Sequence, residues 1–225
     1  SHWMNSVHNM AKDIVFRANE IDYYPVLILE LPYSVAPFIN AYINCQGTAC
    51  DEAYKTIKPY YSTKEGLAFL NDLKAWNAAH PQKKITVACS DIEQGYIFSL
   101  LNLYIPYFDA LGIHDLKDRV NTAKDVTPQI YAYMDSVLKA SPATTVVKDK
   151  PYLTKAKALE VFDSFSAFYH AIQAERKSGQ VDDFMKIRSQ GIYDNLTAPG
   201  KIGGLITKHK FILWGGSAHV RIYQY

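Results

Sequence analysis

Hydrophobic residues in the first ninety positions form two kinds of pattern, helical spacing and short continuous runs. Over Asn5–Asn19, apolar residues recur every three or four positions, which predicts an amphipathic helix. Val26–Leu29 is apolar at every position, and so short a run predicts a parallel strand buried on both faces; Ile85–Cys89 is a second such run. Between them we expect helices over Val35–Asn44 and from the capping box at Ser62 to about residue 80. Strand, helix and strand in this order predict a parallel sheet.

The pattern changes after Asp91, because helical spacing predominates from about residue 94 to 180. We expect helices from the Thr127 cap to Ser141, over Tyr152–Lys177 and over Val181–Leu196, and a last strand at Lys210–Trp214. The fold class predicted is therefore α/β, with a parallel sheet core, helices on its faces and a mainly helical insert. Residues 1–93 form the first part of the core, 94–180 the insert and 181–225 the last part.

Composition and charge narrow the classes of partner. The 225 residues are 48% hydrophobic and carry 24 basic and 22 acidic side chains, for a formal net charge of +2. This near-balance predicts no nucleic-acid partner and no attraction to an anionic membrane surface. Since apolar runs of 18 residues do not occur, we also expect no membrane span. The 17 tyrosines suit pocket walls for a sugar or macrocycle, but equally suit half-buried helix faces, which we prefer.

The three cysteines leave the cellular compartment open. Cys89 lies inside an apolar run and is interpreted as a small core residue. Cys45 and Cys50 bracket a turn-like stretch, where they form either a disulfide, which favours an extracytoplasmic location, or two reduced loop thiols.

Three candidate functional side chains lie at strand ends, which is where open α/β sheets bind ligands. Glu30 closes the first strand, Asp91 follows the second, and His219 follows the last through a glycine-rich turn. Each also has a structural interpretation: Asp91 as a helix cap, Glu30 as half of a structural ion pair, and His219 as a turn residue. Their coincidence favours a functional site.

Several segments, in order along the chain, resemble motifs of the erythromycin esterase family. Trp214-Gly215-Gly216-Ser217-Ala218-His219-Val220 resembles the family's Trp-Ala-His-Asn-x-His-Val, and Arg188–Leu196 is similar to its Arg-Asp-x-x-Met-x-x-Asn-Leu helix. Val26–Glu30 resembles its strand that ends in a functional glutamate. Ser62–Asn77 is similar to its Thr-x-Glu…Trp-Leu-x-x-x-Asn helix, and Ser90-Asp91 to its Gly-Phe-Asp.

The opening residues Ser1-His2 match the end of the family's Gly-Glu-x-Thr-His-Gly signature. On this interpretation the preceding strand lies upstream and the chain is a fragment. The alternative is a vector remnant, which the unusual Trp3 disfavours.

The resemblance implies hydrolysis of an ester or lactone without a serine or cysteine nucleophile. His2 matches the position of the general base, and Glu30 would orient an imidazole or the attacking water. Arg188, unless it is simply a surface residue, would stabilise charge on the carbonyl oxygen, and His219 would complete the polar cluster. The residues expected to bind substrate are Asp91, Trp214, Gly216 and Ser217.

Departures from the family pattern leave a second hypothesis open. Gly216 and Ser217 stand where the family has His and Asn, and Ser189 stands where it has Asp. A catalytically degenerate member would bind a small molecule or glycan without turning it over; a transferase of polysaccharide assembly is a third idea. His8 is a weaker substitute for the missing histidine. A tight pair such as His-x-x-x-His, a nucleotide-binding glycine loop and a Gly-x-Ser-x-Gly elbow do not occur in the sequence, so we predict no metal and no cofactor.

Overall fold

The structure, a computed structural model, describes residues 5–45, 49–58, 64–92, 96–123, 125–148 and 150–215. The chain divides into two compact units, one formed by residues 1–90 and 196–225 and the other by residues 91–195. The boundaries expected from the sequence, after residues 93 and 180, remain a prediction.

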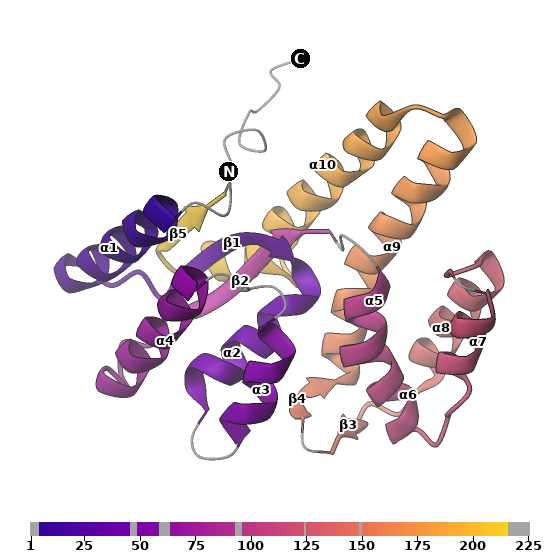
Figure 1. Cartoon of the computed structure of the whole chain (residues 1–225), viewed down its shortest axis with the longest axis horizontal. Helices are drawn as coiled ribbons and strands as arrows, with labels where there is room; N and C mark the ends of the chain where they lie inside the picture. Colours follow the sequence, from indigo (N-terminus) through magenta and orange to yellow (C-terminus); the bar gives the residue numbers. More distant parts are fainter. Residues whose placement is uncertain are drawn as a thin grey trace. The chain divides into compact units, whose positions relative to one another are not determined.

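The first unit is built around a parallel sheet of three strands, in the order β2-β1-β5 (Figure 1). β1 (Val26–Pro32) pairs in parallel with β5 (Phe211–Trp214), so that Val26 lies opposite Phe211 and Leu29 opposite Trp214. β2 spans Thr86–Asp91. The helices of this unit are α1 (Asn5–Ile21), the short 3-10 helix η1 (Tyr33–Val35), α2 (Ala36–Asn44), α3 (Ala49–Ile57), α4 (Lys64–Ala79) and α11 (Ile202–Ile206).

Burial of the strands differs across the sheet. Val26, Leu27 and Ile28 of β1 are at most 2% exposed, as expected for a central strand covered on both faces. In β5, by contrast, Phe211 is 41% and Leu213 is 43% exposed. The hydrophobic core of the unit therefore centres on β1, against which the apolar sides of the surrounding helices pack.

Two asparagines occupy the outer edge of β2. The side-chain amide of Asn40, on α2, accepts from the Val87 N–H at 2.9 Å and donates to the Val87 carbonyl at 2.6 Å. Asn77, on α4, makes the same pair of bonds with Ile85, at 2.7 and 2.9 Å. The backbone groups of residues 85 and 87 point to the same side of the strand. The two asparagine amides therefore take the place of a neighbouring strand and pair the backbone N–H and carbonyl groups at this edge of β2.

The second unit consists of helices and one small hairpin. Its helices are α5 (Tyr96–Ser99), the π-helical turn η2 (Leu100–Tyr104), α6 (Ile105–Ala110), α7 (Leu116–Ala123), α8 (Pro128–Ala140), α9 (Lys155–Ser178) and α10 (Val181–Thr197), whose last two residues fall in the first unit. The hairpin pairs β3 (Val146–Val147) with β4 (Lys150–Thr154) in antiparallel fashion. α8 packs on α9, and α9 on β4 (Figure 1).

The predicted ends of α8, at Thr127 and Ser141, are confirmed. The helix predicted from Tyr152 begins three residues later, at Lys155, because Tyr152–Thr154 belong to β4. The Thr127 and Thr154 hydroxyls each accept from the backbone N–H three residues on, at 3.3 Å, and so cap α8 and α9. Gly179 ends α9 with φ of 69°, a left-handed conformation that glycine adopts without strain.

The structure also differs from the expected elements. β1 continues through Leu31 and Pro32, and β2 includes Ser90 and Asp91, which the sequence placed just beyond it. α3, α11 and the β3–β4 hairpin were not expected. The Ser62 cap lies outside the described residues.

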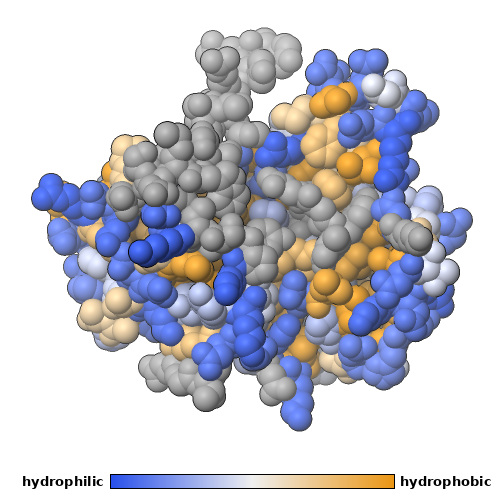
Figure 2. Space-filling view, viewed as in Figure 1, coloured by the Kyte–Doolittle hydropathy of each residue, from blue (hydrophilic) through white to orange (hydrophobic). Residues whose placement is uncertain are grey.

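The coarse α/β class is nevertheless confirmed: a mainly helical chain surrounds a small parallel sheet. Within the described part of the chain, every helix is too short or too polar to cross a membrane. On the side drawn in Figure 2, hydrophilic residues are interspersed with smaller hydrophobic areas.

Close backbone packing at α11 yields a first prediction. A Cβ added to Gly203 would lie 2.2 Å from the carbonyl oxygen of Thr197, whereas one added to Gly200 meets nothing within 4 Å. We expect Gly203→Ala to lower the free energy of unfolding by about 1–3 kcal/mol, because backbone must move. Gly200→Ala, the matched control, should change it by less than about 0.5 kcal/mol. Urea unfolding checks both, and equal values for the two variants would contradict the close approach.

Candidate functional site

Glu30 and Gly215 meet at the carboxyl end of the sheet in the first unit. They follow the registered pair Leu29 and Trp214 on adjacent parallel strands. Glu30 Oε2 lies 3.2 Å from the point where a Cβ on Gly215 would stand, so the glycine leaves room for the carboxylate. Trp214 is half-buried at the end of β5. Because side chains alternate between the two faces of a strand, Glu30 shares a face with Gly215, whereas Trp214 shares the opposite face with Leu29.

Asp91 and Arg188 form an ion pair within the second unit. Arg188 Nε donates to Asp91 Oδ1 at 3.0 Å, and Nη2 donates to Oδ2, so the contact is bidentate. The Asp91 side chain is fully buried and that of Arg188 is 13% exposed. Such a geometry fixes the guanidinium plane and partly neutralises its charge. Asp91 therefore holds Arg188 in place, and its carboxylate is not open to solvent.

A buried amide on α10 adds to this arrangement. Asn195 Nδ2 donates to the Ser164 hydroxyl at 2.9 Å and contacts the Asp91 carbonyl oxygen at 3.4 Å, and Asn195 is 1% exposed. Arg188 and Asn195 lie seven residues apart, which is about two turns, and so share one face of α10. From this face Arg188 contacts the side chain of Asp91 and Asn195 contacts the backbone of Asp91. The role of Ser164 was not predicted, since a serine inside a long helix gives no sequence signal of its own.

Close packing brings α10 against the residue after Asp91. A Cβ added to Gly191 would lie 2.3 Å from the Ile92 side chain. Gly191 stands between Arg188 and Asn195, so its missing side chain lets both reach Asp91.

The remaining predicted site residues lie outside the described residues. They are His2, Gly216, Ser217 and His219. Their assignment as base, cluster member and substrate contacts stays a prediction. Among the residues that the structure describes, no three His, Cys, Asp or Glu side chains gather where they could hold a metal ion.

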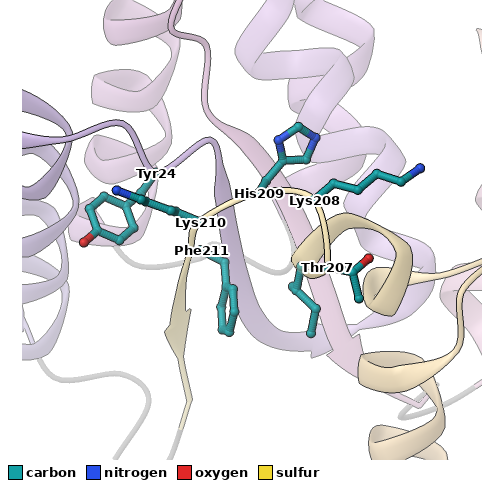
Figure 3. A pocket seen from close by; sticks show the side chains of 7 residues that line it. Tyr24, Thr207, Lys208, His209, Lys210 and Phe211 are labelled. Carbon is teal, nitrogen blue, oxygen red and sulfur yellow. The ribbon is translucent and has the colours of Figure 1, made fainter.

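A surface depression of about 560 Å³ lies elsewhere in the first unit, lined by Tyr24 and residues 206–211 (Figure 3). Tyr24 precedes β1 and Phe211 opens β5, so the depression lies at the amino ends of the strands. Lys210 extends beside the Tyr24 ring, with Nζ 5.8 Å from the ring centroid. Its ammonium also donates to Asp22, and this hydrogen bond holds the pKa of the Asp22 carboxyl below its usual value. Because ligands of parallel sheets bind at the carboxyl ends, this depression is not the candidate site.

Comparison with known proteins bears on the fold. No family model and no curated protein matches the chain. A crystal structure of a Bacillus cereus protein is similar over 95% of this chain and 54% of its own, with a TM-score of 0.62 and 19% identity. A succinoglycan biosynthesis protein is similar over 92% of this chain and 52% of its own, with a TM-score of 0.56 and 16% identity. The chain spans about half the length of these structures, and at such identities the likeness concerns the fold alone.

Proposed function

We propose that this chain carries the site of an erythromycin esterase-like hydrolase, which uses a histidine-activated water to cleave an ester or lactone. The observation that carries the proposal is the buried, bidentate Asp91–Arg188 pair. Burying an ion pair is energetically unfavourable compared with apolar packing, so a retained pair favours a role beyond stability. The two residues are also positions at which the sequence resembles the family.

The proposed roles follow from the local chemistry. A neutral imidazole at His2 removes a proton from water, and Glu30 orients that imidazole or the water. The role proposed for Arg188, as the family resemblance implies, is to stabilise negative charge that develops on the carbonyl oxygen, and Asp91 fixes the plane of its guanidinium. We assign contacts with the substrate to Trp214, Gly216, Ser217 and His219.

The alternative is a degenerate member that binds a glycan or small molecule without cleaving it. Gly216 and Ser217 favour it, because they remove a histidine and an asparagine from the family motif. The name of one structural neighbour, a succinoglycan biosynthesis protein, is the reason to include glycans among the ligands tested.

The test is turnover of a panel of aryl esters, lactones and macrolides by the natural polypeptide that carries this chain. His2→Ala and Glu30→Gln should each lower kcat/KM at least about 100-fold, since each removes a group that acts on the attacking water. Glu20→Gln, which alters an exposed glutamate on α1, is the matched control and should leave kcat/KM unchanged.

The outcomes separate the two hypotheses. Loss of turnover in both site variants, with a pH–rate limb near neutrality, supports the hydrolase. A folded protein that turns over none of the panel but binds an oligosaccharide saturably supports the binding role. Turnover that persists in His2→Ala would remove His2 as the base.

A further inference from the structure

The Cys45–Cys50 disulfide joins two helix ends of opposite polarity. Its sulfurs are bonded, with the two Cα atoms 5.3 Å apart. Cys45 is the C-cap of α2, at the negative end of that helix, and Cys50 is the second residue of α3, at the positive end. Both residues are partly exposed. The two sulfurs therefore differ in their electrostatic surroundings.

Neighbouring groups reinforce this difference. Lys74, on α4, places Nζ 2.9 Å from Cys50 Sγ and 4.9 Å from the centroid of the Tyr42 ring. At Cys45 the neighbour is instead a carbonyl: Sγ lies 2.9 Å from the Tyr42 oxygen, where a thiol would donate. An ammonium stabilises a thiolate, whereas a carbonyl oxygen stabilises a thiol.

Other charged and titratable groups at this place oppose the effect only in part. Asp51 and Glu52 also lie in the first turn of α3, but Lys55 pairs with Glu52 at 2.8 Å. The Tyr42 hydroxyl donates to Asn71, and burial, with the nearby Tyr54, raises the pKa of Tyr42, so that it stays uncharged at neutral pH. Lys74 is the group in direct contact with Cys50.

We propose that Cys45–Cys50 is a thiol–disulfide exchange site, at which a low-molecular-weight thiol bonds to Cys45 and Cys50 leaves as the thiolate. The incoming thiolate attacks Cys45 Sγ, and the S–S bond breaks with its electron pair going to Cys50 Sγ, beside Lys74. A disulfide breaks faster when the leaving sulfur is the better stabilised thiolate. A second thiol then attacks the mixed disulfide, Cys45 leaves and takes up a proton, and the reductant is released as its own disulfide.

The first experiment identifies the sulfur that is modified. The oxidised chain is incubated with glutathione, quenched in acid, alkylated and mapped by peptide mass spectrometry. We expect glutathione on Cys45 and the alkyl label on Cys50. Cys89, which is fully buried, should carry neither and serves as an internal control. Glutathione mainly on Cys50, or equally on both, would overturn the proposal.

The second experiment tests the role of Lys74. Reduction by dithiothreitol should be about three- to tenfold slower in Lys74→Met than in the unchanged chain, because the departing thiolate loses its cation. Lys74→Arg, which keeps the charge, should restore most of the rate. An unchanged rate in a folded Lys74→Met variant would contradict the assignment. If that variant fails to fold, the Lys74→Arg rate and the position of the glutathione adduct decide.

Discussion

Replacing Arg188 with methionine is expected to lower the free energy of unfolding by about 3–5 kcal/mol. The variant leaves the Asp91 carboxylate buried, at 0% exposure, without the guanidinium that accounts for two of its hydrogen bonds. A buried carboxylate has given up its hydration, and the bidentate guanidinium is the opposite charge that compensates for this loss. Urea unfolding at neutral pH measures the loss.

Two controls separate the buried pair from the loss of an arginine in general. Arg176→Met breaks an ion pair with Asp125 in which the Arg176 side chain is 56% and the Asp125 side chain 31% exposed. It should lower the free energy of unfolding much less than Arg188→Met does. The double variant Asp91→Asn with Arg188→Met removes both charges and should recover part of the stability. If Arg188→Met and Arg176→Met lowered the free energy of unfolding equally, the Asp91–Arg188 pair would contribute no more to stability than an exposed pair.

The two residues of this pair differ in how far the sequence predicts their positions. Continuous apolar runs mark buried parallel strands, so the sequence predicts Glu30 and Asp91 near a carboxyl edge, although each strand extends two residues beyond the predicted end. The partner of Asp91 could not be found in this way. Arg188 lies 97 residues away, and its direction depends on the rotation of α10. That rotation is set by packing, including the contact of Gly191 with Ile92.

Elements missed by the sequence share one physical cause: their local pattern is weak and tertiary contacts stabilise them. α3 offers two buried apolar positions, Ala53 and Ile57, and is tied to α2 by the disulfide. The β3–β4 hairpin contains a proline and has little hydrophobic alternation, yet β4 packs on α9 and β3 on α6. In both cases long-range contacts outweigh the local propensity.

Asn77 belongs to a motif that resembles the family, yet its role in the structure is to support the fold. Asn77 matches the asparagine of a family motif, and a polar residue on a helix would ordinarily be assigned to the surface. Here it is 1% exposed and bonds both backbone groups of Ile85. A family match at Asn77 therefore does not by itself indicate catalysis.

Asn77→Leu is accordingly expected to lower the free energy of unfolding by about 2–4 kcal/mol. Leucine is similar in size but cannot pair with the N–H and carbonyl of Ile85, which would remain buried without these partners at the edge of β2. Each unmade backbone hydrogen bond in a buried position costs about 1–3 kcal/mol, which gives the expected range.

Asn44→Ala is the matched control, because Asn44 is exposed and leaves both Ile85 bonds in place: it accepts a 3.2 Å bond from Asn77 Nδ2 and donates to the Asn40 carbonyl of its own helix at 2.9 Å. We expect it to cost less than about 1 kcal/mol. Hydrogen exchange supplies an independent readout: the Ile85 amide should lose protection in Asn77→Leu, while the Val87 amide, held by Asn40, should keep most of its own. A retained Ile85 protection together with an unchanged urea midpoint would mean that β2 does not depend on Asn77. The combined result would show whether side-chain amides, rather than a neighbouring strand, end the sheet at this edge.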